Sequence, residues 1–230
     1  MKNAGNVNRK KGVCKVDPMK KLTLTVLAVL CAASLVPAAG KLTFGVKAGM
    51  ISANMLTADN EVQWTAKWGI MGGAFACFAL SDMFAVQTEV LYSPKGARYT
   101  LTDGTTTLTA TVVAPYIDIP LLLKFFLPTG SSEGVRPVVF AGPYIAFKAG
   151  AGKFKTDIAY SGQHDVSEDT LTNLKGTDFG FVLGVGAEFP LNTMKITIDV
   201  RWGKSLSTIS TEGDNTKNKV WTFLLGFSFN

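Results

Sequence analysis

The stretch FGFVLGVGAEF, residues 179–189, has large apolar residues at every second position and glycines between them. Three interpretations compete: a dinucleotide-binding loop, a GxxxG helix seam or a β-strand. A dinucleotide loop needs a third glycine and a following helix, but the run ends at Pro190 without either. A membrane helix seam needs a longer and less strictly alternating run, so the period of two predicts a strand. Its apolar face would be Phe179, Phe181, Leu183, Val185, Ala187 and Phe189, and its other face Asp178, Gly180, Gly184, Gly186 and Glu188.

The same alternation recurs in seven other segments. In YIDIPLLLKFFL, residues 116–127, one face is wholly apolar and the other carries Asp118 and Lys124. Residues 195–206, KITIDVRWGKSL, repeat the scheme. Most of the segments reach the roughly 9 to 11 residues that a tilted strand needs to cross a bilayer. The predicted strands are 42–50, 67–80, 83–99, 115–127, 136–149, 177–189, 195–206 and 219–229.

The connections between these strands alternate in length. Three are short, and the others are long and polar, the longest covering residues 150–176. Short turns on one rim and long loops on the other are typical of outer-membrane barrels. Asp103–Gly104, between two Thr-rich runs, predicts that the loop after the third strand continues as a hairpin. The expected fold is all-β: an eight-stranded antiparallel up-and-down transmembrane β-barrel with short periplasmic turns and long extracellular loops.

A soluble lipocalin-type barrel would show the same alternation with its apolar face turned inward. A solvated sheet face is normally rich in Lys, Glu and Thr. The polar face here consists largely of Gly, Ala, Thr and Ser, with a few charges of both signs, which suits a narrow lumen. Trp202 and Trp221 are placed to join interfacial aromatic girdles. The pattern therefore favours a membrane barrel with its apolar face outward.

The N-terminal segment has the layout of a secretory signal peptide at residues 19–40. A Lys20–Lys21 pair precedes an apolar run from Leu22 to Leu35, and small residues follow Pro37. Residues 1–18 are interpreted as a non-native or extended n-region, and residues 41–230 as the barrel domain. The expected location is the outer membrane of a Gram-negative bacterium.

The sequence pI of 9.2 would by itself indicate a polyanionic partner. Residues 1–40, however, hold seven of the 23 Lys and Arg and one of the 17 acidic residues, which leaves 16 of each in the barrel domain. The net charge of that domain is zero, so no nucleic-acid partner is expected.

Six segments resemble a known family: LTFGVKAGM, LYSPKGARY, YIDIPLLLKFFLP, VVFAGPYIAF, TDFGFVLGVGAEF and LLGFSF. In this order they are similar to the PorT-like outer-membrane β-barrel domain of Bacteroidota, across the whole of residues 41–230. The resemblance implies a single eight-stranded barrel inserted in the outer membrane. It implies little about activity, although the name-giving member is tied to protein secretion.

The predicted polar faces carry ten charged residues: Lys47, Glu89, Asp118, Lys124, Lys148, Asp178, Glu188, Lys195, Asp199 and Arg201. An eight-stranded barrel is just wide enough for side chains to fill it, so these charges are expected to form lumenal ion pairs. The hypothesis is that Arg201 and Lys124 pair with Glu89, Asp118, Glu188 or Asp199 and close the lumen. The structural lumen cluster is thus predicted to be Glu89, Asp118, Lys124, Asp178, Glu188, Asp199 and Arg201.

An enzyme needs a nucleophile with a base and an orienting group, or a set of metal ligands. The only histidine is His164, on the longest loop beside Asp165. Asp165, Glu168 and Asp169 could gather a calcium ion only weakly, because their spacing is not that of an EF-hand. We expect no catalytic, cofactor or metal site.

Three classes of function remain. The favoured one is a structural or interaction barrel whose extracellular loops meet a surface or envelope protein, with a link to secretion or surface assembly. The alternatives are a narrow porin-like channel for small solutes and an outer-membrane enzyme. The expected partners are outer-membrane lipid and an envelope or surface partner at the loops, and the barrel is expected to be a monomer.

Overall fold

The computed structural model describes residues 41–56, 64–129, 134–211 and 215–229. The predicted signal peptide and the segment before it lie outside the described residues. No helix in the described part is long and apolar enough to cross a membrane. The strands are β1 (Leu42–Leu56), β2 (Lys67–Ala79), β3 (Phe84–Asp103), β4 (Thr106–Phe126), β5 (Arg136–Lys148), β6 (Gly152–Tyr160), β7 (Gln163–Leu171), β8 (Thr177–Leu191), β9 (Met194–Ser205) and β10 (Lys217–Phe229).

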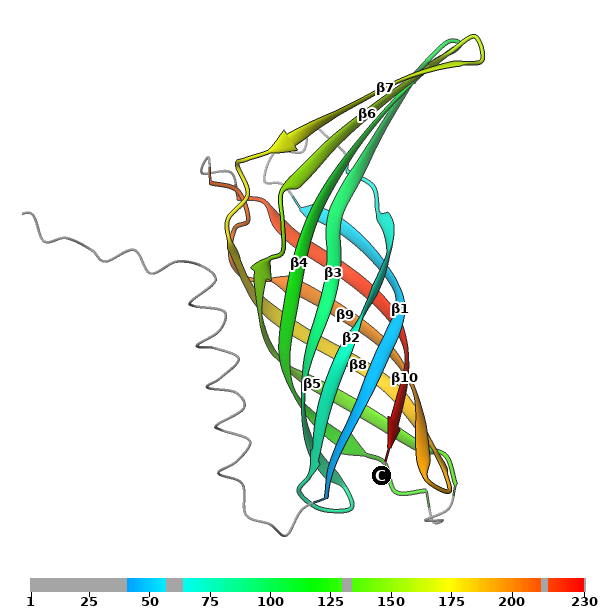
Figure 1. Cartoon of the computed structure of the whole chain (residues 1–230), viewed down its shortest axis with the longest axis vertical. Helices are drawn as coiled ribbons and strands as arrows, with labels where there is room; N and C mark the ends of the chain where they lie inside the picture. Colours follow the sequence, from blue (N-terminus) through cyan, green and yellow to red (C-terminus); the bar gives the residue numbers. More distant parts are fainter. Residues whose placement is uncertain (1–40, 57–63, 130–133, 212–214, 230) are drawn as a thin grey trace, which may run out of the picture. The chain divides into compact units, whose positions relative to one another are not determined.

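Eight of the strands form a closed antiparallel ring. Its order is β1, β2, β3, β4, β5, β8, β9, β10, and β10 pairs back onto β1. Each of the eight predicted segments lies in one of these ring strands, so the predicted all-β up-and-down barrel is confirmed. The turns β2–β3, β4–β5 and β8–β9 lie together at one end with the last residues of β10 (Figure 1). We call this the short-turn end, and the opposite end the long-loop end.

The barrel is apolar outside and polar inside. Outward side chains such as Ile70 (78% exposed), Phe44 (62%) and Val185 (56%) form a wide exposed apolar surface. The alternate, inward positions carry buried charges, including Glu89 at 1% and Arg201 at 4% exposure. This arrangement is the reverse of that in a soluble barrel. It is the one expected for a β-barrel in lipid, where the apolar face must point outward.

A four-stranded sheet extends past the ring at the long-loop end. The β3–β4 pairing continues to Asp103 opposite Thr106, which confirms the hairpin predicted at Asp103–Gly104. The first half of β4 then pairs with β6, and β6 pairs with β7. The prediction of one long loop over 150–176 was therefore incomplete, because most of it is the β6–β7 hairpin. The β7 side chains are exposed and mostly polar, so no burial imposes an apolar alternation there, whereas Phe154 and Ile158 on β6 are partly buried.

Candidate functional site

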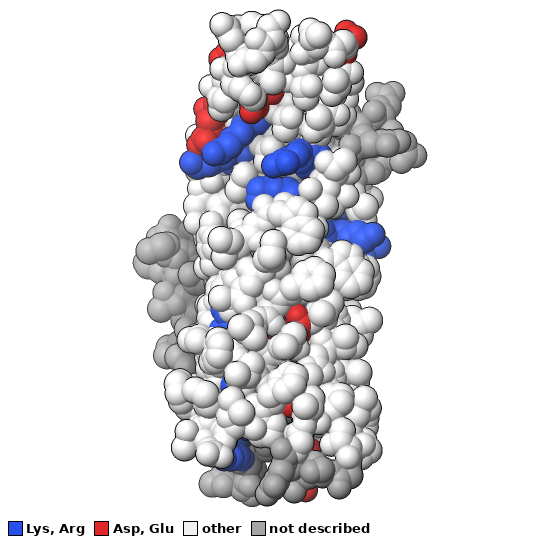
Figure 2. Space-filling view, turned by 90° about the vertical axis from the view of Figure 1, so that its right-hand side faces the viewer, with Lys and Arg blue, Asp and Glu red and all other residues white. Residues whose placement is uncertain are grey.

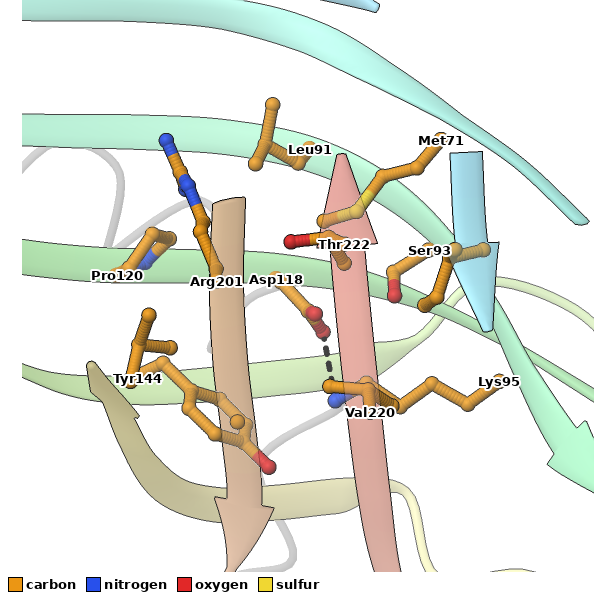
Figure 3. Close-up of a pocket in the computed structure, with 13 residues that line it drawn as sticks. Met71, Leu91, Ser93, Lys95, Asp118, Pro120, Tyr144, Arg201, Val220 and Thr222 are labelled. Atoms are coloured by element: carbon orange, nitrogen blue, oxygen red, sulfur yellow. Dashed lines mark ion pairs between the residues drawn. The ribbon is translucent and has the colours of Figure 1, made fainter. Parts of the chain in front are cut away.

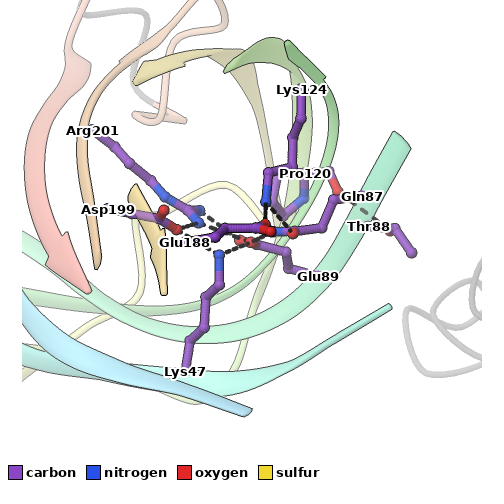
Figure 4. A network of polar contacts seen from close by, with 9 residues as sticks. All are labelled: Lys47, Gln87, Thr88, Glu89, Pro120, Lys124, Glu188, Asp199 and Arg201. Carbon is purple, nitrogen blue, oxygen red and sulfur yellow. Dashed lines mark hydrogen bonds and ion pairs between the residues drawn. The ribbon is translucent and has the colours of Figure 1, made fainter. Parts of the chain in front are cut away.

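Inward side chains from five ring strands meet in one lumenal network (Figure 4). We define the lumen network as Lys47, Gln87, Glu89, Lys124, Glu188, Asp199 and Arg201. They come from β1, β3, β4, β8 and β9, each at a position where the strand's period of two points the side chain inward. Three cations thus meet three carboxylates, and the network is neutral.

Arg201 is the centre of this network. Its Nη1 donates to Glu89 Oε2 at 2.5 Å and its Nη2 to Glu89 Oε1 at 2.8 Å, a bidentate pair. Nη2 also donates to Asp199 at 2.7 Å. Lys47 Nζ lies between the same two carboxylates, 3.1 Å from Glu89 and 2.5 Å from Asp199. Two cations and two anions therefore share one lumenal site.

The network continues across the lumen through an amide. Gln87 donates to Glu89 through its Nε2, and its Oε1 accepts a hydrogen bond from Lys124 at 3.3 Å. Lys124 also donates to Glu188 at 2.6 Å. Burial removes these carboxylates and ammonium groups from water, which costs free energy. Their pairing with one another offsets this cost.

A second polar cluster lies nearer the long-loop end, around Asp178. Its carboxylate accepts hydrogen bonds from five side chains: Lys95 (3.2 Å), Tyr144 (3.2 Å), Ser205 (2.9 Å), Ser207 (3.0 Å) and Asn218 (3.1 Å). Lys95 also lies 3.0 Å from Asp118. We call these six residues, together with Asp118, the Asp178 cluster.

The predicted pairings were right in part. Arg201 pairs with Glu89 and Asp199, and Lys124 with Glu188, all within the set that the sequence proposed. Asp118 is different, because it pairs with Lys95. The sequence reasoning missed Lys95, although it is in phase with Glu89 on the same strand; Pro94 and Gly96 on either side obscured the alternation. It also missed the bridging role of Gln87 and left Lys47 out of the predicted cluster.

The other two predicted inward lysines lie at opposite ends. Lys148 donates to the Leu174 carbonyl at 3.3 Å, close to the long-loop end. Lys195 lines a cavity of about 220 Å³ at the short-turn end, together with Thr43, Cys77, Glu188 and Ser228. This cavity borders the lumen network, since Glu188 belongs to both.

Between the two clusters lies a cavity of only about 30 Å³ (Figure 3). It is lined by both apolar and polar side chains, among them Leu91, Lys95, Asp118 and Arg201. A single water needs about 10 to 15 Å³, so the space holds one or two waters and no larger solute. The described lumen is thus filled across its width by side chains, as expected for eight strands.

The glycines of the opening stretch accommodate aromatic rings. Gly184 is directly opposite Phe140, and Gly180 is opposite Tyr144 on β5. A Cβ on Gly184 would meet the Phe140 ring, and one on Gly180 would lie 2.5 Å from the Tyr144 ring. The space beside Gly180 and Gly184 is thus taken by the facing aromatic residue of the neighbouring strand, and not by a charged residue from across the lumen. At Gly186 the near charge is Asp199, again from an adjacent strand.

Lumenal cations lie over the same rings. Arg201 Cζ is 5.2 Å from the Phe140 centroid, and Lys95 Nζ is 4.4 Å from the Tyr144 centroid. The same arrangement therefore occurs twice: an aromatic ring on one strand lies between a glycine of the next strand and a lumenal cation. Such cation–π contacts add to the ion pairs in a desolvated lumen.

The candidate residues of the longest loop lie on the β6–β7 hairpin and do not converge. His164 Nδ1 lies 3.0 Å from Asp157 rather than beside Asp165. Glu168 pairs with Lys153 at 2.6 Å and Lys155 at 2.9 Å. These hydrogen bonds, first from Lys153 and then from Lys155, lower the pKa of Glu168, and the same contact raises the pKa of Lys153. Across the described ranges no three potential metal ligands cluster.

Comparisons with known proteins find similarity to outer-membrane β-barrels. The family model of the outer membrane protein beta-barrel domain matches residues 33–211. Among solved structures, the chain is similar to OprG from Pseudomonas aeruginosa at 15% identity, covering 83% of this chain and 96% of that chain with a TM-score of 0.47.

Two other solved structures are comparably similar. Neisserial surface protein A matches at 12% identity, 82% and 98% coverage and a TM-score of 0.44. The attachment invasion locus protein Ail of Yersinia pestis matches at 13% identity, 81% and 98% coverage and a TM-score of 0.39. The comparison with curated proteins finds no match.

Proposed function

We propose that this chain, which belongs to the outer membrane protein beta-barrel domain family, is a barrel closed to solutes that acts through its long-loop end. The proposed location is the outer membrane of a Gram-negative bacterium, with the short turns in the periplasm. The outward apolar surface and the family support this location. Membrane fractionation tests it, and recovery as a soluble periplasmic protein would overturn it.

The closed state is supported by the lumen network. Its members come from strands all round the ring, including the diametrically opposed β3 and β9. Replacing the network by a hydrated path would require separating its five buried ion pairs, which costs several kcal/mol for each uncompensated ion. A planar-bilayer recording on the purified protein should therefore show almost no conductance. Steady single-channel currents would favour the alternative of a narrow channel.

The observation that carries the interaction role is the exposed edge of β7. This strand pairs only with β6, so its other edge has no strand beside it in the described sheet. The β6–β7 turn is Ser161–Gly162, with φ of 46° and 79°, as in a two-residue hairpin. Tyr160 and Gln163 then form a hydrogen-bonded pair, which directs the N–H groups of His164, Val166 and Glu168 to the free edge.

We infer that an envelope or surface protein adds an extended segment to this edge by β-strand addition. Natural sheets normally protect such an edge, so a long unprotected one projecting past the barrel suits recognition. The resemblance to PorT-like barrels adds a role in secretion or surface assembly to the proposal.

A proline on β7 separates edge binding from barrel structure. Val166→Pro removes an N–H that points to the free edge and leaves the β6 ladder intact, whereas Val166→Ala keeps the N–H and serves as the control. Site-specific crosslinking from β7 in cells should trap an envelope protein with the wild type and with Val166→Ala, but not with Val166→Pro. Equal crosslinking in all three, or none in the wild type, would contradict the proposal.

A further inference from the structure

A pair of lysines without an ion-pair partner among the described residues lies on the outer surface of the barrel. Lys204 on β9 and Lys219 on β10 are directly opposite each other in the strand register. Both occupy outward positions, because their neighbours Gly203, Ser205 and Val220 point inward and are buried. Lys217, two residues further along β10, is outward as well.

No acidic side chain in the described residues neutralises this pair. None of the ion pairs in that part of the chain includes Lys204, Lys217 or Lys219. The adjacent outward positions are Asn54 on β1 and Phe181 on β8. Like charges directly opposite on a sheet are destabilising. A bound anion would remove this repulsion.

The pair lies at the boundary of the apolar belt. Trp202 and Trp221 are directly opposite each other two residues closer to the short-turn end, and the next outward pairs are Val200 with Phe223 and Ile198 with Leu225. On the face shown in Figure 2, Lys and Arg side chains gather in a band across the upper part of the molecule, above a surface that is nearly uncharged. A tryptophan pair with lysines just beyond it is the order expected at a membrane interface.

We propose that Lys204 and Lys219, with Lys217 beside them, bind a phosphorylated lipid headgroup of the outer leaflet. Facing Cβ atoms are about 5 Å apart in such a pair, so both ammonium groups can reach one phosphate. The lipid's acyl chains would lie along the apolar residues below the tryptophans, while the lysine stems cover apolar surface at the interface. The inference rests on the membrane location proposed above.

The test uses the full-length protein, delipidated and reconstituted into nanodiscs of neutral lipid with a minor fraction of phosphorylated lipid A. The readout is the amount of lipid A retained after detergent extraction. The variant Lys204→Gln/Lys219→Gln should retain about thirtyfold less than the wild type, in line with roughly 1 kcal/mol for each lysine near an anionic surface. The matched control Lys153→Gln/Lys155→Gln removes the same charge from the β6–β7 hairpin and should retain as much as the wild type.

Two further arms identify the ligand. Dephosphorylated lipid A should be retained poorly by every variant, and free inorganic phosphate should not displace the lipid. Equal retention by the wild type and Lys204→Gln/Lys219→Gln, equal losses in both double variants, or displacement by free phosphate would overturn the proposal. Membrane fractionation of the same variants distinguishes failure of the lipid site from failure of the proposed location. If the protein is in the membrane but retains lipid A independently of its phosphates, only the lipid site is refuted. If the protein is absent from the membrane, the location is refuted.

Discussion

Arg201 and Glu89 join the two sides of the barrel. They lie on β9 and β3, which are four strands apart in a ring of eight, and the guanidinium holds both carboxylate oxygens at 2.5 and 2.8 Å. A bidentate pair across the full diameter fixes the distance between opposite walls. The lumen is thus closed and braced by the same contact.

Arg201→Ala should therefore destabilise the barrel and loosen its lumen. Removing one partner of a buried pair leaves Glu89 partly uncompensated, which costs about 3 to 5 kcal/mol. We expect a lower unfolding midpoint in urea in lipid vesicles, and small conductance events in planar bilayers. Lys153→Gln, on the exposed hairpin, should change neither quantity. Unchanged stability together with unchanged conductance in Arg201→Ala would refute the bracing role.

The two carboxylates that hold Lys95 should differ in importance. Asp178 accepts hydrogen bonds from five side chains, whereas Asp118 forms its ion pair with Lys95. Asp178→Asn turns an amide N–H group toward several hydrogen-bond donors, and it removes one of the two carboxylate charges that pair with Lys95. It should therefore lower the free energy of unfolding by about 3 kcal/mol or more. Asp118→Asn leaves Lys95 paired with Asp178 and should cost less. Unfolding of both variants in vesicles measures the difference, and the reverse order would be inconsistent with Asp178 as the main acceptor.

Gly184 tests the contact between glycine and the aromatic ring. Gly184→Ala places a methyl group against the Phe140 ring, over which Arg201 lies, and such overpacking costs about 1 to 3 kcal/mol. Adding Phe140→Leu should recover part of the loss, because the ring is what the methyl meets. Gly176→Ala is the control, since nothing lies within 4 Å of its added Cβ. The idea fails if both glycine variants unfold at the same urea concentration.

Glu168 should titrate below the ordinary carboxyl range. The hydrogen bonds from Lys153 and Lys155 favour its charged form and lower its pKa. The stability that these hydrogen bonds give to the hairpin is therefore fully present above the pKa of Glu168 in the unfolded chain. It is lost as the pH falls through the lowered pKa of Glu168 in the folded chain. An NMR titration of the Glu168 carboxyl carbon should give a midpoint below the ordinary glutamate pKa of 4.5. In Lys153→Gln/Lys155→Gln the midpoint should return toward that value, and equal midpoints would contradict the assignment.

How far the sequence predicts the structure depends on burial. Strands that cross lipid must be apolar on every outward residue, so the period of two located all eight ring strands, including the stretch from Phe179 to Phe189. The β7 strand is exposed from Gln163 to Thr170, and β6 is only partly buried. Burial therefore constrains these two strands less than the ring strands, and the sequence predicted only a loop there.

The sequence by itself determined most of the charged residues that face the lumen, because alternation assigns a face to Glu89, Asp118, Lys124 and Arg201 one strand at a time. Only the tertiary structure decided which charges pair and what occupies the space beside the glycines. Closure of the ring brings β3 opposite β9, and the strand stagger sets the height at which each side chain enters the lumen. Contacts between strands depend on the ring closure and on the strand stagger, and the alternation within a single strand determines neither of them.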